Sequence, residues 1–252
     1  MGQLRKPFQG IVNIIRFNWH FYIMAIVLIA ILLVLANYTN STFKLFINTS
    51  CFLLFLTIFI SLLVSYYVYD LSGFYNFNWI PNDTQKISIL NINAGFDETS
   101  ELLIAKFKNS DFLALDFYNS KKHTEISIKR ARKAYPPYSN TMHINSSKIE
   151  LANSSVDKIF VILSAHEIRN IEERIHFFKE LNRILKPKGT LIVIEHLRDF
   201  ANFMAYTIGA FHFYSKASWL NTFHKANLKM TKQIKNTAFI STFILEKNGN
   251  TL

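Results

Sequence analysis

Polar side chains follow the apolar runs of this sequence at points where a fold could bring them together. The run Ile87–Ile92 leads into the turn Asn93–Asp97, and the run Phe112–Leu115 ends on the carboxylate of Asp116. An acid about 20 residues after a turn glycine is typical of nucleotide-binding strand–helix–strand units, where it binds ribose hydroxyls. This spacing predicts a nucleotide-type cofactor site around the turn.

Histidine and glutamate residues follow the apolar runs further along the chain. His166-Glu167 follows the run Asp157–Leu163 after two small residues. A histidine with a pKa near neutral pH can remove a proton from an oxygen or carbon nucleophile. We therefore predict His166 and Glu167 as catalytic residues, with His166 as the base. Zinc binding by His166, His196 and His212 is not favoured, because their spacing is irregular, and we expect no metal.

The order of the apolar runs indicates which elements carry these residues. Short runs rich in β-branched residues alternate with amphipathic segments, which is typical of an α/β fold with a Rossmann-like, doubly wound, mostly parallel sheet. In such a sheet the ligand binds at the carboxyl ends of the strands. The predicted strands are Ile87–Ile92, Phe112–Leu115, Thr141–Ile144, Asp157–Leu163, Thr190–Glu195, Lys229–Lys235 and Phe239–Glu246.

The N-terminal third has a different composition. Phe21–Tyr38 and Leu45–Tyr69 contain no charged residue, and each is long enough to cross a bilayer core, which takes about 20 residues. They predict a transmembrane α-helical hairpin that precedes the sheet. We divide the chain into an anchor, 1–82, and a soluble domain, 83–252. The aromatic segment Gly73–Asp83 is expected to lie along the membrane surface.

Charge predicts how the chain is oriented. The formal net charge is +11. Arg5, Lys6 and Arg16 precede the first span, whereas Lys44 is the only charge between the spans. The positive-inside rule then places both termini and the domain in the cytoplasm, with the hairpin integral to the cytoplasmic membrane. A single cysteine, Cys51, excludes an internal disulfide and fits a reducing compartment.

Basic and aromatic segments indicate possible partners. The stretch 120–148 is rich in Lys and Arg, which fits a solvated helix or contact with anionic membrane lipids. Nucleic acid is not favoured as a partner, since no stacking platform accompanies the charge. Phe203–Tyr214 is aromatic and carries few charges, so we expect a lid, a substrate pocket or a surface that leans on the membrane.

The run from Asp157 to Glu195 resembles a known family. Its segments DKIFVILSAHEI and ERIHFFKELNRILKPKGTLIVIEH are similar to those of class I S-adenosylmethionine-dependent methyltransferases, in which a strand ending in His-Glu precedes a helix, a Pro/Gly stop and a further strand. The resemblance covers roughly 86–247. It implies S-adenosyl-L-methionine as the cofactor and methyl transfer as the reaction.

The resemblance also implies which residues bind the cofactor. The family's first strand ends in acid-x-Gly-x-Gly-x-Gly, of which only Gly95 is present. Asn91 stands in place of the acid, and Asn93, which tolerates a positive φ, stands in place of a glycine. Asp116 matches the ribose-binding acid, and Asn145 lies where an acid near the adenine is common. The implied cofactor site is Asn91, Asn93, Ala94, Gly95, Asp116, Phe117, Asn145, Ser146 and Ser164.

Asp97 and Glu98 help to choose between cofactors. Negative charge at a helix start disfavours a pyrophosphate, so a dinucleotide is the weaker alternative. The two acids would suit a sulfonium and an ammonium group, or would cap the helix. We expect a membrane-anchored methyltransferase acting on a small lipophilic acceptor, with membrane lipids and that acceptor as partners. A catalytically inactive methyltransferase-like binding or scaffold protein, or an RNA-modifying enzyme, remains an alternative.

Overall fold

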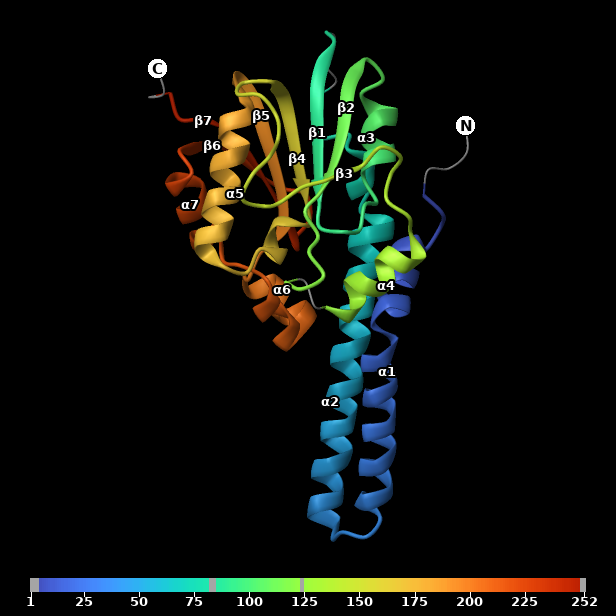
Figure 1. The fold of residues 1–252 in the computed structure, drawn as a ribbon. Helices are drawn as coiled ribbons and strands as arrows, with labels where there is room; N and C mark the ends of the chain where they lie inside the picture. Colours follow the sequence, from blue (N-terminus) through green and yellow to red (C-terminus); the bar gives the residue numbers. More distant parts are fainter. Residues whose placement is uncertain (1–4, 82–84, 123–124, 250–252) are drawn as a thin grey trace.

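The two apolar runs form a pair of helices that projects from the rest of the chain (Figure 1). α1 (Gln9–Ala36) and α2 (Ser41–Tyr66) pack against each other. The Asn40 side chain accepts a hydrogen bond from the Phe43 N–H, which satisfies one of the free donors in the first turn of α2. The computed structural model describes residues 5–81, 85–122 and 125–249.

Both helices are long and apolar enough to cross a membrane. α1 has 28 residues, so it spans about 42 Å at 1.5 Å per residue, against about 30 Å for a bilayer core. The helix begins well before the predicted start at Phe21. Its additional N-terminal turns lie against the domain, where Phe17 is buried.

Polar contacts fasten the hairpin to the domain. α2 continues into a π-helical turn, Tyr67–Leu71. There the carboxylate of Asp70 accepts hydrogen bonds from the Gly10 and Ile11 N–H groups, both at 2.8 Å. A carboxylate at this end of α1 is stabilised by the helix dipole. The carboxylate of Glu98 forms an ion pair with Arg5 at 3.2 Å. The start of α1 is thus held by two acids.

The sheet has the predicted doubly wound, mostly parallel form. Its strand order is β3-β2-β1-β4-β5-β7-β6; the first five strands in this order are parallel, and β7 is antiparallel to both β5 and β6. The strands are β1 (Ile87–Asn93), β2 (Ser110–Asp116), β3 (Met142–His143), β4 (Val156–Ile162), β5 (Leu185–His196), β6 (Leu228–Lys235) and β7 (Ile240–Lys247). The helices are α3 (Ser100–Lys106), α4 (Ile126–Ala134), α5 (Ile171–Ile184), α6 (Phe200–Tyr206) and α7 (Lys216–Lys225).

Apolar side chains cover the sheet on both faces. On one face α5 and α7 bring Phe178, Trp219 and Phe223 onto the strands. On the other face the short helix α3 covers only part of the strands. Phe74 and Phe77, from the segment after α2, are buried there beside Phe160.

The second face corrects a prediction. The described part of the aromatic segment, 73–81, was expected along the membrane surface, but it belongs to the core of the domain. Its rings supply cover that the seven-residue helix α3 cannot provide alone. The segment that follows α2 is therefore part of the core, and this fixes the position of the hairpin relative to the strands.

Candidate functional site

A cavity of about 870 Å³ lies where the carboxyl ends of β1 and β4 face the hairpin. α4 and α6 lie at the junction of hairpin and domain (Figure 1). The walls come from α1, α2, the turn after β1, α4 and the 3₁₀ segments on either side of the site. Side chains that line it include Phe17, Phe21, Ser61, Asn93, Ala94, Glu98, Glu125, Ser164, His166, Glu167, His196 and His212. The position matches the ligand site expected for an open α/β sheet.

The turn after β1 brings backbone close to the cavity. Gly95 has φ +96°, and a Cβ there would lie 2.9 Å from both the Tyr118 ring and the Arg132 guanidinium, so only glycine fits. Asn93 does not take the predicted positive φ. Instead its side-chain oxygen accepts the Gly95 N–H at 2.9 Å. Its Nδ2 is buried and has no hydrogen-bond partner among the described residues. The turn therefore offers a donor to a ligand.

Asp116 ends β2 beside this turn, as predicted, but its carboxylate is already engaged. One oxygen accepts the Tyr118 N–H at 2.8 Å, and the other lies 2.5 Å from Nη1 of Arg132. The Arg132 guanidinium also stacks over the Tyr118 ring, 4.4 Å from its centroid. Arg132 thus covers the Asp116 oxygen that was predicted to bind ribose hydroxyls. For a ribose to bind there, the guanidinium would have to move away, or both groups would have to donate to the same oxygen.

Acidic and amide residues around the start of α3 support the fold. Asn91 is buried and donates to the hydroxyls of Thr99 and Ser100 at 3.0 and 2.9 Å. Asp97 accepts the N–H groups of the same two residues, which corresponds to helix capping and not to contact with a sulfonium. Glu98 lines the cavity, but it is paired with the hairpin. Asn91 does not face the cavity.

Of the implied cofactor site, Asn93, Ala94 and Ser164 line the cavity, Gly95 and Asp116 lie beside this lining, and three further residues point elsewhere. Phe117 is buried in the core, its ring 5.3 Å from that of Phe177. Asn145 is exposed and accepts the N–H of its neighbour Ser147. Ser146 donates to Glu173 on α5. Because β3 has only two residues, the chain after it is irregular, and its side-chain directions did not follow from the sequence pattern.

The residues after β4 and β5 meet in one cluster. Ser164 donates to the Ile92 carbonyl at 3.0 Å, which ties the ends of β1 and β4 together. Nδ1 of His166 lies 2.7 Å from Glu195, a fully buried residue of β5. Nε2 of His166 lies 3.3 Å from Glu167. The same Glu167 oxygen is 3.8 Å from Nε2 of His212, which comes from the segment after α6.

Burial and charge set different protonation states in this cluster. Burial alone would lower the pKa of His166, but Glu195 and Glu167 outweigh it and raise the pKa to about 10. Burial would raise the pKa of Glu167, but His166 lowers it to about 2. Burial and the charge of His166 lower the pKa of His212 to about 4. At neutral pH His166 is charged, unlike the predicted base, and Glu167 and His212 are the proton acceptors.

Two members of the site were not predicted from the sequence. Glu125, which precedes α4, lies 3.2 Å from Nδ1 of His212. Glu195 was noted only as a strand end, although it holds His166. A carboxylate closing a fully apolar strand was the available signal for Glu195. The sequence carries no comparable signal for Glu125, because α4 has to be folded against α1 before this residue approaches the others.

His196 links the domain to the hairpin through buried hydrogen bonds. Its Nδ1 lies 3.0 Å from the carbonyl oxygen of Phe239. A carbonyl can only accept, so Nδ1 carries the proton. Nε2 accepts from the hydroxyl of Tyr69 at 2.8 Å. Burial lowers the pKa of His196 to about 4, and the ring is therefore neutral at pH 7.

Acidification should weaken this link. The pKa of His196 is about 4 in the folded chain and about 6.5 in the unfolded chain. Its contribution to stability is therefore complete above pH 6.5 and is lost as the pH falls from about 6.5 to about 4. From pH 7 to 5 we expect His196 to lower the free energy of unfolding by about 2 kcal/mol. Thermal melting of the full chain in detergent measures this loss. His196→Gln should reduce it, and an unchanged pH dependence in that variant would contradict the assignment.

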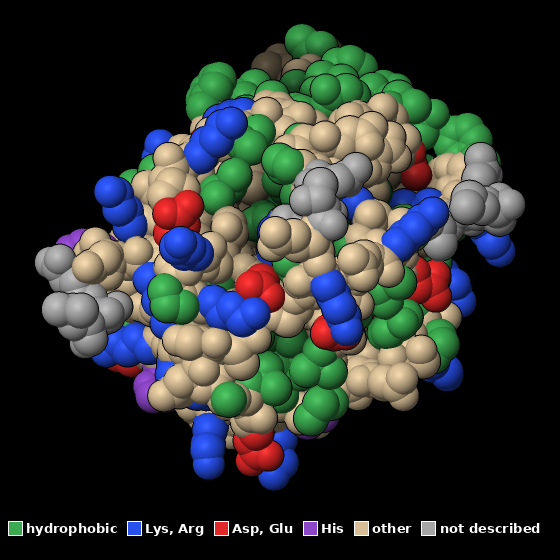
Figure 2. Space-filling view, turned by 90° about the horizontal axis from the view of Figure 1, so that it is seen from above, with side chains coloured by type: hydrophobic (Ala, Val, Ile, Leu, Met, Phe, Trp, Pro, Cys, Tyr) green, Lys and Arg blue, Asp and Glu red, His purple; other side chains and the backbone are tan. Residues whose placement is uncertain are grey.

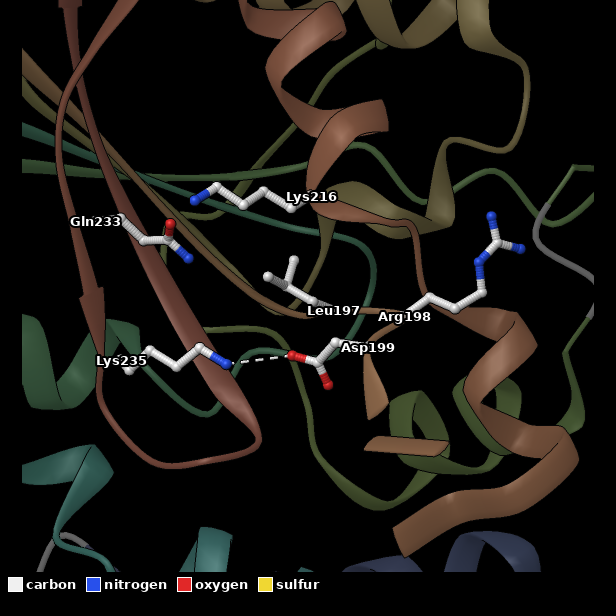
Figure 3. A pocket seen from close by; sticks show the side chains of 6 residues that line it. All are labelled: Leu197, Arg198, Asp199, Lys216, Gln233 and Lys235. Atoms are coloured by element: carbon white, nitrogen blue, oxygen red, sulfur yellow. Dashed lines mark hydrogen bonds and ion pairs between the residues drawn. The ribbon is translucent and has the colours of Figure 1, made fainter. Parts of the chain in front are cut away.

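A second hollow contains none of the predicted site residues. This hollow of about 360 Å³ is lined by Leu197, Arg198, Asp199, Lys216, Gln233 and Lys235. There Lys235 faces Asp199 at 3.3 Å while Arg198 points away (Figure 3). The end of the domain away from the hairpin carries Lys and Arg side chains interspersed with acidic and apolar ones (Figure 2). No single basic groove is visible on that face.

Comparison with known proteins agrees with the geometry. A family model described as a methyltransferase domain matches residues 94–193. An O-methyltransferase family 2 protein from Planctomyces limnophilus, solved in complex with apigenin, is 12% identical with a TM-score of 0.52, over 76% of this chain and 61% of that one. A putative methyltransferase from Haloferax volcanii, in complex with the activator Trm112, is 13% identical with a TM-score of 0.50, over 67% of this chain and 85% of that one.

These likenesses to solved structures show the fold. No curated protein sequence matches this chain. The residues around the turn fit the family's cofactor in part: glycine is required at Gly95, Asn93 has a free donor, and an acid ends β2. Residues 94–193 thus match a methyltransferase domain, and the strand order and the fold are those of the class I S-adenosylmethionine-dependent methyltransferases.

Proposed function

We propose that this methyltransferase is anchored in a membrane by α1 and α2 and methylates a small lipophilic acceptor that enters from the bilayer. In this arrangement both termini and the catalytic domain lie in the cytoplasm. Arg5 and Lys6 precede α1, whereas the opposite end of the hairpin carries Lys44 in the first turn of α2, and this asymmetry supports that orientation. The proposal rests on one observation, which is that a single cavity joins the hairpin to the strand ends.

The depth of the cavity supports entry from the membrane. Phe21 and Tyr22 line it, and the charge-free run of α1 begins at Phe21. Ser61 lines it from α2. This end of the cavity therefore lies where the apolar span begins, at the level expected for a membrane interface. At the other end the same cavity reaches Asn93 and Ser164, on the carboxyl ends of the strands.

The segment after β5 supports the same placement. α6 and the 3₁₀ turn after it expose large apolar side chains beside α2. Ile208 is 82% exposed and Phe200 is 79% exposed. An apolar patch of this kind on a protein surface commonly marks contact with a membrane or a partner. We infer that this segment rests in the interface and closes the cavity on that side.

The residues divide into a cofactor side and an acceptor side. On the cofactor side Asn93, Gly95 and Asp116 would hold S-adenosylmethionine, which supplies a methyl group from its sulfonium when bound. On the acceptor side Glu167 and His212 are unprotonated at neutral pH, and either can take the proton of an acceptor hydroxyl. Charged His166 is held by Glu195 and keeps Glu167 in position. Apolar walls keep water away from the acceptor.

One observation favours a second function. The ion pair between Asp116 and Arg132, together with the missing glycines, is what a methyltransferase-like binding protein without catalysis would show. Isothermal titration of the full chain in detergent with S-adenosylmethionine separates the two. Micromolar binding supports the enzyme. A folded protein that does not bind it supports the binding protein.

The acceptor side is tested by following the methyl group. The full chain is incubated with methyl-labelled S-adenosylmethionine and a membrane extract. We expect the label to appear in the chloroform-soluble fraction. Label confined to the aqueous fraction would contradict a lipophilic acceptor.

A variant on α2 sharpens that test. Ser61→Phe fills the cavity on the membrane side and should lower kcat/KM for the lipid-phase acceptor about tenfold, with the affinity for S-adenosylmethionine unchanged. Leu63→Phe, at an exposed position of the same helix, is the matched control. Equal rates in the two variants would show that the acceptor does not pass this part of the cavity.

A further inference from the structure

We propose that His166, Glu167 and His212 bind a divalent transition-metal ion of the zinc type in the wall of the cavity. The side chains come from two distant parts of the chain, the 3₁₀ turn Ala165–Glu167 and the 3₁₀ segment Thr207–His212. From the sequence, zinc binding by His166, His196 and His212 was not favoured. In the structure His196 is engaged with Tyr69 and Phe239 instead, and Glu167 takes the third position.

The three ligand atoms have the spacing of a metal site. They lie within 4.8 Å of one another. Glu167 Oε1 is 3.3 Å from Nε2 of His166 and 3.8 Å from Nε2 of His212. Tetrahedral zinc with bonds of about 2.0–2.1 Å places its ligand atoms about 3.3 Å apart. Small side-chain shifts therefore bring all three atoms onto one ion.

Each imidazole is also oriented as in metal sites. A metal-binding histidine almost always donates its other ring N–H to a carboxylate or carbonyl, which fixes the tautomer and directs the free nitrogen at the ion. Nδ1 of His166 lies 2.7 Å from Glu195, and Nδ1 of His212 lies 3.2 Å from Glu125. Both rings thus have Nδ1 near a carboxylate and Nε2 on the side of Glu167. Nη2 of Arg169 also lies 2.5 and 2.6 Å from the two ring nitrogens of His212, so this guanidinium has to move aside before Nε2 can bind the ion.

The cluster has a net negative charge, which favours binding of a cation. Three carboxylates, those of Glu125, Glu167 and Glu195, surround the two rings. One guanidinium, that of Arg169, lies 3.5 Å from Glu125 and donates to the His212 carbonyl. With both imidazoles neutral, as metal ligands are, the cluster keeps two uncompensated negative charges. A divalent ion balances this charge.

The ion would keep one position open. All three ligands line the cavity, and a zinc site with three protein ligands generally leaves the fourth place to water or substrate. Resting on the proposed function, an oxygen of the acceptor would take that place, where the ion lowers the pKa of a hydroxyl. With the ion bound, Glu167 and His212 are ligands, and Glu125, which also lines the cavity, takes the proton that they accept in the metal-free chain. Binding of the ion itself does not depend on the acceptor or the cofactor.

Metal titration tests the site directly. The full chain, carrying no histidine tag and treated with a chelator, is titrated with ZnCl₂ in detergent without S-adenosylmethionine or acceptor. We expect one equivalent to bind with a Kd on the order of micromolar or tighter. His212→Ala and Glu167→Gln should abolish stoichiometric binding. Glu195→Gln, at a positioning residue, should weaken it 10–100-fold.

Controls separate a specific site from surface binding. His176 is exposed on α5, where it hydrogen-bonds to the Ser147 carbonyl and lies outside the cavity lining, so His176→Ala should bind zinc like the unsubstituted chain. Addition of Co²⁺ should give visible absorption bands of a tetrahedral site in that control, and His212→Ala should lack them. His212 is 29% exposed, so this variant is expected to fold, which melting checks. The absence of a bound equivalent, or equal affinity in His176→Ala and His212→Ala, would overturn the site even if methyl transfer is intact.

Discussion

Glu195→Gln should lower the free energy of unfolding by about 3–5 kcal/mol at pH 7. Glu195 is fully buried and holds His166 at two points, its Nδ1 at 2.7 Å and its backbone N–H at 3.2 Å. Glutamine preserves the shape but removes the charge that keeps the buried imidazolium in place. Breaking a buried pair leaves the other charge uncompensated, which costs more than the pair contributes. Thermal melting of the chelator-treated full chain measures the change.

The pH dependence gives a second readout of the same pair. The pKa of His166 is raised to about 10, so its contribution is complete below pH 6.5 and is lost as the pH rises through about 10. The unsubstituted chain should lose stability between pH 7 and 10, and Glu195→Gln should lose less. Asp111→Asn removes an ion pair whose side chains are 62% and 70% exposed, and should cost at most about 1 kcal/mol. A loss of equal size in both variants would show that Glu195 does not hold a buried charge.

Asp116→Ala should weaken binding of S-adenosylmethionine about 100-fold. Two hydrogen bonds from ribose hydroxyls to a carboxylate contribute about 1.5 kcal/mol each, and each 1.4 kcal/mol corresponds to a factor of ten. The carboxylate ends β2 beside the turn that contains Gly95. Isothermal titration of the full chain measures Kd. An unchanged Kd would remove Asp116 from the cofactor site.

Arg132→Ala should have the opposite effect. Arg132 contacts the Asp116 oxygen that ribose would use, and this contact has to be given up or shared when the cofactor binds. The Arg132 side chain is 34% exposed, so the competing pair contributes about 1 kcal/mol or less. We expect a gain in affinity of up to about fivefold. Lys133→Ala, at an exposed neighbour on α4, is the control for charge alone. Weaker binding in Arg132→Ala would instead make Arg132 a direct ligand of the cofactor.

Much of the architecture could be predicted because it depends on local patterns. The charge-free runs and the alternation of buried strands with amphipathic helices need no knowledge of neighbours, and they predicted the hairpin and the mostly parallel sheet. The cofactor was implied by the resemblance of the run 157–195 to a known family. The position of Asp116 at a strand end was predictable for the same reason. Parallel strands bring their carboxyl ends to one edge, so Asn93, Ser164, His166 and Glu167 could be expected near one another.

Only the tertiary structure decided what each polar group contacts. At strand ends the backbone becomes irregular, and the direction of a side chain then depends on what packs above it. Asp116 is covered because α4 presents Arg132 to it, and Glu98 turns to the hairpin because α1 brings Arg5 there. His212 meets Glu167 because the segment after α6 folds back beside α2. Sequence alone therefore determined the class of protein, whereas packing between distant segments determined the cluster of histidines and acids.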